Sequence, residues 1–161
     1  MASRSLTTAD PILAEKFLLL QEAYSREFSP WYLQITCVHR DPAEQRALYA
    51  QGREALDIVN SLRRASGLPP ITTEANSRKV TWTLRSKHMA MPARAIDVVP
   101  MTEEADFTGV LKAHVDFNDL TRFKPLVSLA KQFGLVSGGS WTPPDWPHLE
   151  LPPEPPLIER A

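Results

Sequence analysis

The sequence predicts an α+β fold, a small antiparallel sheet with flanking helices. Near the start and the end of the chain, apolar residues recur at three- and four-residue spacing, as on the buried face of a helix. Short runs of alternating apolar and polar residues lie between and after these stretches, as in half-buried strands. Helices placed early and late around short strands favour the α+β class. The 161 residues suffice for one hydrophobic core and show no internal repeat, so we expect a single domain over 1–161.

Three helices are expected, over residues 10–28, 41–64 and 119–133. The first two begin at Asp-Pro pairs, in which the aspartate caps the helix and the proline occupies its first turn. Gly52 lies inside the second helix and weakens it by about 1 kcal/mol relative to alanine, so we expect a bend or a break there. Gly134 is expected to end the third helix.

Strands are expected over 32–38, 95–99 and 148–151, where apolar side chains alternate with polar ones. The stretch 66–85 is polar and broken by glycine and proline, which predicts a long loop with a short strand at 80–82. Residues 152–161 begin Pro-Pro-Glu-Pro-Pro, and this sequence cannot form a helix or a central strand. We therefore expect a proline-rich, extended C-terminal tail.

The composition argues against several classes of partner. With 18 basic and 19 acidic residues, the net charge of −1 gives no electrostatic footprint for nucleic acid. The first nine residues lack the apolar region of a secretory signal, so we expect synthesis in the cytoplasm without a leader. The apolar cluster 17–20 is too short to span a membrane, so no stable membrane insertion is expected.

Cys37 is the single cysteine, which excludes an intrachain disulfide. It lies in an apolar alternating run, and we interpret it as a small core residue. A metal site in this chain is therefore expected to use nitrogen and oxygen ligands, a donor set that favours zinc or a similar divalent ion.

Two of the four histidines lie near carboxylates. His88 precedes Asp97 by nine positions, and His148 follows Asp145 by three. Asp97 interrupts the apolar run Ala-Ile-Asp-Val-Val, where a charged group is costly unless it is paired or bound to a metal. Alone, Asp97 would be interpreted as a surface carboxylate and each histidine as a hydrogen-bonded residue. Three ligand-type residues in matching contexts favour instead a hydrolytic zinc site with an open position for water.

Strand periodicity predicts which side chains share a face. Ile96 and Val98 should face the core, which leaves Asp97 on the opposite face. In the last strand, His148 and Glu150 should likewise lie opposite the leucines that alternate with them. The two polar faces could therefore meet across one sheet, and His88 could join them from the preceding loop.

These residues carry a family resemblance. Ser86-Lys87-His88, the Ala-x-Asp that ends at Asp97, and Asp145-Trp146-Pro147-His148 resemble the S-x-H, A-x-D and D-x-x-H signatures of the D-alanyl-D-alanine carboxypeptidase and L-alanyl-D-glutamate peptidase superfamily. These are zinc peptidases of the peptidoglycan stem peptide, and many are phage endolysins. The block 39–53 is similar to the family's R-x-x-x-x-Q-x-x-L-Y-x-x-G-R, and 138–141 to its G-G-x-W, so the resemblance covers about 38–151.

One spacing departs from the family. The family usually separates its first histidine and aspartate by seven positions with a glycine between, whereas this chain has nine positions and Met91-Pro92. Two extra residues preserve the facing of Asp97, because side chains in a strand alternate with a period of two. We therefore expect the metal geometry to be kept, and the rim of the substrate pocket to differ.

The resemblance implies a hedgehog/D,D-peptidase-like fold and a role for each matching residue. It implies Zn²⁺ held by His88, Asp97 and His148. It places the general base at Asp145. Glu150 is an alternative base, because it shares a strand face with His148; if it is not the base, Glu150 supports the ligands or the structure. Arg40 would bind a substrate carboxylate or stabilise the oxyanion, with a surface salt bridge as the alternative. The positions expected near the substrate are Ser86, Gln45 and Trp141, for which capping, a helix-surface role and packing, respectively, stay open.

The expected function is a zinc metallopeptidase that cuts peptidoglycan stem peptides at the L-alanyl-D-glutamate bond. As a phage-type endolysin it would be a monomer and would act on the host cell wall after release by a separate partner. The alternatives are a D-alanyl-D-alanine carboxypeptidase or dipeptidase, because the same ligands serve both, and a catalytically degenerate protein that binds peptidoglycan peptides.

Overall fold

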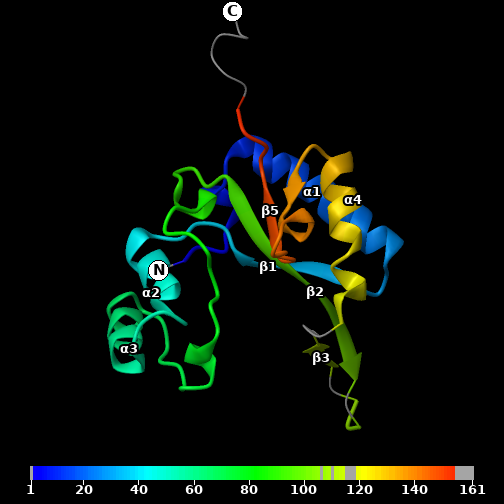
Figure 1. Cartoon of the computed structure of the whole chain (residues 1–161). Coiled ribbons are helices and arrows are strands. Elements are labelled where there is room, and N and C mark those ends of the chain that lie inside the picture. The colour runs from blue at the N-terminus through cyan, green and yellow to red at the C-terminus, as the bar shows by residue number, and fades with distance from the viewer. Residues whose placement is uncertain (1, 106, 110, 115–118, 155–161) are drawn as a thin grey trace, which may run out of the picture. The chain divides into compact units, whose positions relative to one another are not determined.

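Four α-helices and a small sheet with antiparallel pairings form the main regular structure of the described residues, and this confirms the predicted α+β class. The structure is a computed structural model that describes residues 2–105, 107–109, 111–114 and 119–154 (Figure 1). Internal contacts divide the chain into two compact units, which are described in turn. Unit 1 comprises 1–10 and 37–94, and unit 2 comprises 11–36 and 95–161. The finer hedgehog-like classification stays a prediction.

The sheet lies in unit 2 and has the strand order β1-β2-β5-β4, with β3 paired to β2. The pairings β2–β3, β2–β5 and β4–β5 are antiparallel. The expected strands β1, β2 and β5 are present, whereas β3 and β4 were not predicted. The bounds are β1 Tyr32–Cys37 (Cys37 itself belongs to unit 1), β2 Ala95–Ala105, β3 Leu111–His114, β4 Val136–Ser137 and β5 His148–Glu150.

Two helices of unit 2 lie side by side, α1 (Pro11–Glu27) and α4 (Pro125–Gln132) (Figure 1). The Tyr24 hydroxyl on α1 donates to the Arg122 carbonyl just before α4, at 2.8 Å. The predicted helix 119–133 is wrong in its first turns, because Asp119 caps a separate 3-10 turn over Leu120–Arg122 and α4 begins only at Pro125. The fully buried side chains of this unit include Leu13, Phe17, Leu20, Ile96, Val98, Leu126 and Leu149.

Unit 1 contains α2 (Pro42–Ala50) packed against α3 (Leu56–Ala65). The predicted helix 41–64 is broken at Gly52, which has a φ of 77°. A Cβ atom at Gly52 would lie 2.7 Å from the Lys79 backbone nitrogen, so only glycine allows the chain to pass this closely. The break therefore separates two helices and brings the long loop against the end of α2.

The strand predicted at 80–82 is wrong: this segment has no regular structure. Side chains of α2 and of the turn that follows it take the place of a neighbouring strand by donating to its backbone carbonyls. Gln45 Nε2 donates to the Thr83 carbonyl at 2.7 Å, and Arg53 Nη1 donates to the Thr81 carbonyl at 3.0 Å. The hydrogen-bond partners of this segment therefore come from α2 and the turn after it, and not from a strand.

The chain ends contribute little regular structure to the described part. Near the N-terminus, Ser3 forms an isolated bridge with His39, and Ala9 forms one with Ala93. At the other end, residues 152–154 lack regular structure, and the rest of the predicted tail lies outside the described residues. None of the helices described is long and apolar enough to cross a membrane.

Candidate metal centre

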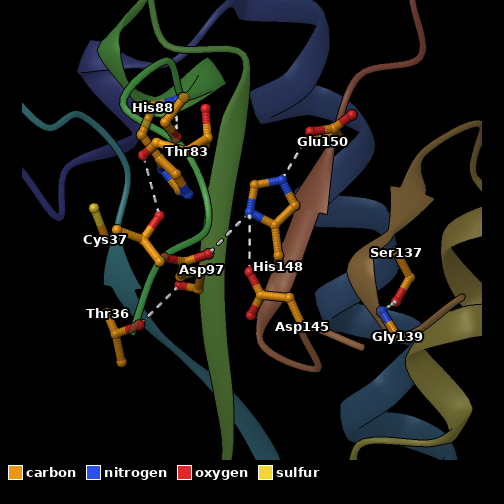
Figure 2. A network of polar contacts seen from close by, with 12 residues as sticks. Thr36, Cys37, Thr83, His88, Asp97, Ser137, Gly139, Asp145, His148 and Glu150 are labelled. Atoms are coloured by element: carbon orange, nitrogen blue, oxygen red, sulfur yellow. Dashed lines mark hydrogen bonds and ion pairs between the residues drawn. The ribbon is translucent and has the colours of Figure 1, made fainter. Parts of the chain in front are cut away.

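Asp97 and His148 face each other across two neighbouring strands of unit 2. They are directly paired in the antiparallel register of β2 and β5 (Figure 2). His148 Nδ1 lies 3.3 Å from Asp97 Oδ1, and the two side chains are 8% and 19% exposed. Ile96 and Val98 are completely buried on the other face of β2, so the predicted facing of Asp97 is confirmed. Strand alternation and register together bring two ligand-type atoms to one place.

Glu150 fixes the second nitrogen of the His148 ring. Its Oε2 atom lies 2.8 Å from His148 Nε2, because the two residues alternate onto the same face of β5. An ionised carboxylate only accepts hydrogen bonds, so Nε2 carries the proton and donates a hydrogen bond to Glu150. In the neutral ring, the lone pair is then on Nδ1, which faces Asp97. A carboxylate that holds a histidine in this way is the usual support of a metal ligand.

The contact between His148 and Asp97 requires a positive charge. A lone pair on Nδ1 and a carboxylate oxygen repel each other at 3.3 Å unless a proton or a metal cation lies between them. Two donors bound at about 2.0–2.1 Å to one tetrahedral zinc ion lie about 3.3 Å apart. The spacing of the two atoms is therefore compatible with two ligands of the same ion.

Asp145 approaches the same imidazole from the turn before β5. Its Oδ2 atom lies 4.0 Å from His148 Nδ1, and half of its side chain is exposed to solvent (Figure 2). The Asp145 backbone nitrogen donates to the Gly138 carbonyl at 2.8 Å. A Cβ atom at Gly138 would clash with the Asp145 carbonyl oxygen and would lie 3.0 Å from His148 Cβ, so glycine is required here. The Gly138-Gly139 turn thus allows the segment that carries Asp145 and His148 to pack closely.

Trp141 covers the His148 ring from the side of the same turn. The centroids of the two rings are 4.9 Å apart, with an interplanar angle of 45°. The indole is 39% exposed, so one part of it packs on the imidazole and another part faces solvent. Both a packing role and a substrate contact are compatible with this position.

In unit 1, His88 is buried on a short 3-10 turn over Lys87–Met89. Ser86 caps this turn, because its Oγ atom accepts a hydrogen bond from the His88 backbone nitrogen at 3.2 Å. His88 Nδ1 lies 2.8 Å from the Val38 carbonyl oxygen. A carbonyl can only accept, so Nδ1 carries the proton and the lone pair of the neutral ring is on Nε2. Ser86 therefore positions the histidine, and Nε2 is the atom that could bind a metal.

Arg40 and Gln45 form a hydrogen-bonded pair in unit 1. Arg40 Nη1 donates to Gln45 Oε1 at 2.9 Å, and Nη2 lies 3.6 Å from the Cys37 sulfur. Gln45 is completely buried, and its Nε2 atom donates to the Thr83 carbonyl. Both ends of the Gln45 amide thus have protein partners, so a substrate contact would require one of them to exchange. In this arrangement Gln45 orients the Arg40 guanidinium.

A cysteine enters the set of possible ligands. Among the described residues, Cys37, His88 and Asp97 form a group that could hold a metal ion. Cys37 is buried, as expected of a core residue, but the expectation that only nitrogen and oxygen donors are available is wrong. The identity of the metal does not follow from this group.

The comparisons with known proteins add no family. A scan against models of protein families found no match, and a search of curated proteins found none either. The function is therefore inferred from the side chains described above and from the resemblance of their motifs.

Proposed function

We propose that this protein is a zinc-dependent peptidase that hydrolyses peptidoglycan stem peptides at the L-alanyl-D-glutamate bond, as a phage-type endolysin. The observation that carries the proposal is the His148–Asp97 pair at 3.3 Å, with Glu150 on the other ring nitrogen at 2.8 Å. This pair needs a proton or a metal ion between its atoms, its spacing fits two ligands of a tetrahedral ion, and its histidine has the supporting carboxylate typical of metal sites.

The proposed ligands are His88, Asp97 and His148. His88 offers Nε2 as the ligand atom, since Nδ1 donates a hydrogen bond to the Val38 carbonyl. Two imidazoles and one carboxylate suit zinc and leave a position open, as catalytic rather than structural zinc sites do. When bound, zinc would polarise the scissile carbonyl and lower the pKa of water towards neutrality.

Asp145 is the proposed general base. Its carboxylate is half exposed and lies 4.0 Å from His148 Nδ1, so it can meet both solvent and a group bound near the histidine. It would take a proton from the attacking water and return it to the nitrogen of the leaving amine. Glu150 is unsuited to this role, because its Oε2 atom already accepts the His148 Nε2 proton.

Arg40 is proposed to stabilise negative charge on the substrate. Its Nη1 atom is held by Gln45, which fixes the plane of the guanidinium before substrate binds. An orientation fixed in advance costs no reorganisation when charge develops on the carbonyl oxygen, and this is the main benefit of such donors. A substrate carboxylate would be bound by the same group in the same way.

The test is mass spectrometry of muropeptides after digestion of purified sacculi by the full-length protein. We expect products with a newly exposed D-glutamate amino terminus, loss of activity with a chelator, and recovery with zinc. Released D-alanine would instead identify the carboxypeptidase alternative. Binding of muropeptides without any product, with zinc present, would identify the non-catalytic alternative and overturn the proposal.

A further inference from the structure

The segment Arg78–Arg85 of unit 1 presents three apolar side chains to solvent at alternate positions. Val80 is 53% exposed, Trp82 62% and Leu84 46%. Tryptophan is usually the most costly side chain to leave in water, and clustered exposed apolar side chains often mark an interaction site. We call these three residues, together with Lys79 and Arg53, the Trp82 surface.

Hydrogen bonds fix the backbone of this segment to helix α2 and to the turn that follows the helix. Gln45 Nε2 lies 2.7 Å from the Thr83 carbonyl oxygen and 3.2 Å from Thr81 Oγ1. Arg53 Nη1 donates both to the Thr81 carbonyl, at 3.0 Å, and to the Tyr49 carbonyl, at 2.7 Å. Three of these four contacts reach the segment, and they fix the backbone that carries the exposed side chains. A surface that is ordered in advance loses less conformational entropy on binding.

Two cationic side chains lie near the indole of Trp82. Lys79 Nζ lies 5.4 Å from its ring centroid, and the Arg53 guanidinium lies 5.9 Å from it and 3.9 Å from that of Tyr49. From residue 78 to residue 87 the chain has four basic side chains and no acidic one, although its net charge is −1. The surface thus combines an exposed aromatic face with local positive charge, and this charge selects an anionic partner.

We propose that the Trp82 surface binds an anionic glycan, with a sugar ring stacked on Trp82 and a sugar carboxylate beside Lys79 and Arg53. The flat C–H face of a sugar ring packs on an indole, and a carboxylate pairs with the neighbouring cations. A single-stranded nucleic acid fits less well, because it needs successive aromatic side chains along a continuous basic groove. The choice of the peptidoglycan glycan strand as the polymer rests on the proposed function. The inference that the Trp82 surface binds an anionic glycan does not.

The first experiment measures binding to soluble glycan strands from which the stem peptides have been removed, so that cleavage plays no part. We expect Trp82→Ala to bind at least about tenfold more weakly, as loss of one stacking residue does for other polymers. We expect Lys79→Gln to bind roughly two- to fivefold more weakly, the usual range for an exposed cation next to a ring. The matched control is Ile58→Ala on helix α3, whose side chain is 47% exposed in the same unit. It should bind like the unaltered protein.

Equal binding by Trp82→Ala and the unaltered protein would overturn the inference. So would tighter binding of oligodeoxythymidylate, or of vesicles containing phosphatidylglycerol, than of the glycan. Circular dichroism shows whether each variant is folded, and Trp82→Phe, which keeps an aromatic face, should retain most of the binding.

A second measurement separates this inference from the proposed function. Trp82→Ala should cut a short soluble stem peptide at the normal rate but should digest intact sacculi more slowly. If the unaltered protein binds the glycan but cuts no peptide, the proposed function fails and the glycan surface stands. If it cuts the peptide but does not bind the glycan, the glycan surface fails and the proposed function stands.

Discussion

His88 and His148 are both buried, but opposite kinds of partner hold their rings. His88 lies on a short turn and points Nδ1 at a backbone carbonyl, a neutral acceptor. His148 lies in a strand, with Glu150 at Nε2 and Asp97 at Nδ1. The backbone carbonyl only orients its ring. The two carboxylates also bring negative charge, which a proton or a metal ion must balance.

The comparison shows which of the two histidines has partners that substitution can remove. In unit 1 the tautomer of His88 is fixed by a backbone group that no point substitution removes. In unit 2 the charge that attracts a cation comes from side chains, and each of these can be substituted. The affinity for metal should therefore respond most strongly to changes around His148.

The largest effect should follow from removal of His148. We expect His148→Ala to weaken zinc binding by more than about 100-fold, because loss of a ligand exceeds the loss of about 10–100-fold caused by removal of a supporting group. Cys37→Ser should bind zinc nearly as well as the unaltered protein. Metal content after dialysis against a competing chelator measures both, and circular dichroism shows whether each variant is folded. If Cys37→Ser lost the metal and His148→Ala kept it, the ligands would be Cys37, His88 and Asp97.

A smaller effect should follow from changes at Glu150. We expect Glu150→Ala to lower the affinity for zinc about 10–100-fold, because Nε2 of His148 loses its acceptor and the ring its orientation. Glu150→Gln keeps an acceptor oxygen and should lower the affinity less. Glu104→Ala, an exposed carboxylate on β2, serves as the control. Unchanged affinity in Glu150→Ala would show that this hydrogen bond does not support a ligand.

The smallest effect concerns Tyr24, which lies in unit 2 with His148. Burial raises the pKa of Tyr24 to about 12, partly offset by the positive charge of Arg122. Between pH 10, its usual pKa, and pH 12, the folded protein binds more protons than the unfolded chain does, so the free energy of unfolding should fall as pH rises through this window. Urea denaturation at several pH values measures it.

Tyr24→Phe should lose this pH dependence and about 1 kcal/mol of stability at neutral pH, because the Arg122 carbonyl loses its donor. Its zinc affinity should be unchanged, which separates the stability of unit 2 from the histidine site. A Tyr24→Phe variant with the same loss of stability between pH 10 and pH 12 would assign that loss to other groups.

Several features of the fold were predictable because they depend on short-range chemistry. The Asp-Pro pair before α2 caps this helix as expected, since Asp41 Oδ1 accepts a hydrogen bond from the Glu44 backbone nitrogen at 2.8 Å. The break at Gly52 was predicted from the low helix propensity of glycine, and the facing of Asp97 from strand alternation; the structure gives Gly52 a positive φ. The strands β3 and β4 were missed, because two to four residues carry too little periodicity for a prediction.

The sequence by itself indicated His88, Asp97 and His148 as residues that could bind a metal, though not Cys37, and it indicated the strand face that Asp97 and His148 occupy. Residue type and a period of two are local properties, so they survive any arrangement of the chain. Only the tertiary structure decided that Asp97 is opposite His148, that Glu150 holds its second nitrogen, and that Gln45 is buried against Arg40 and Thr83. Strand register and side-chain hydrogen bonds between distant segments depend on how the whole core packs, and no local pattern records them.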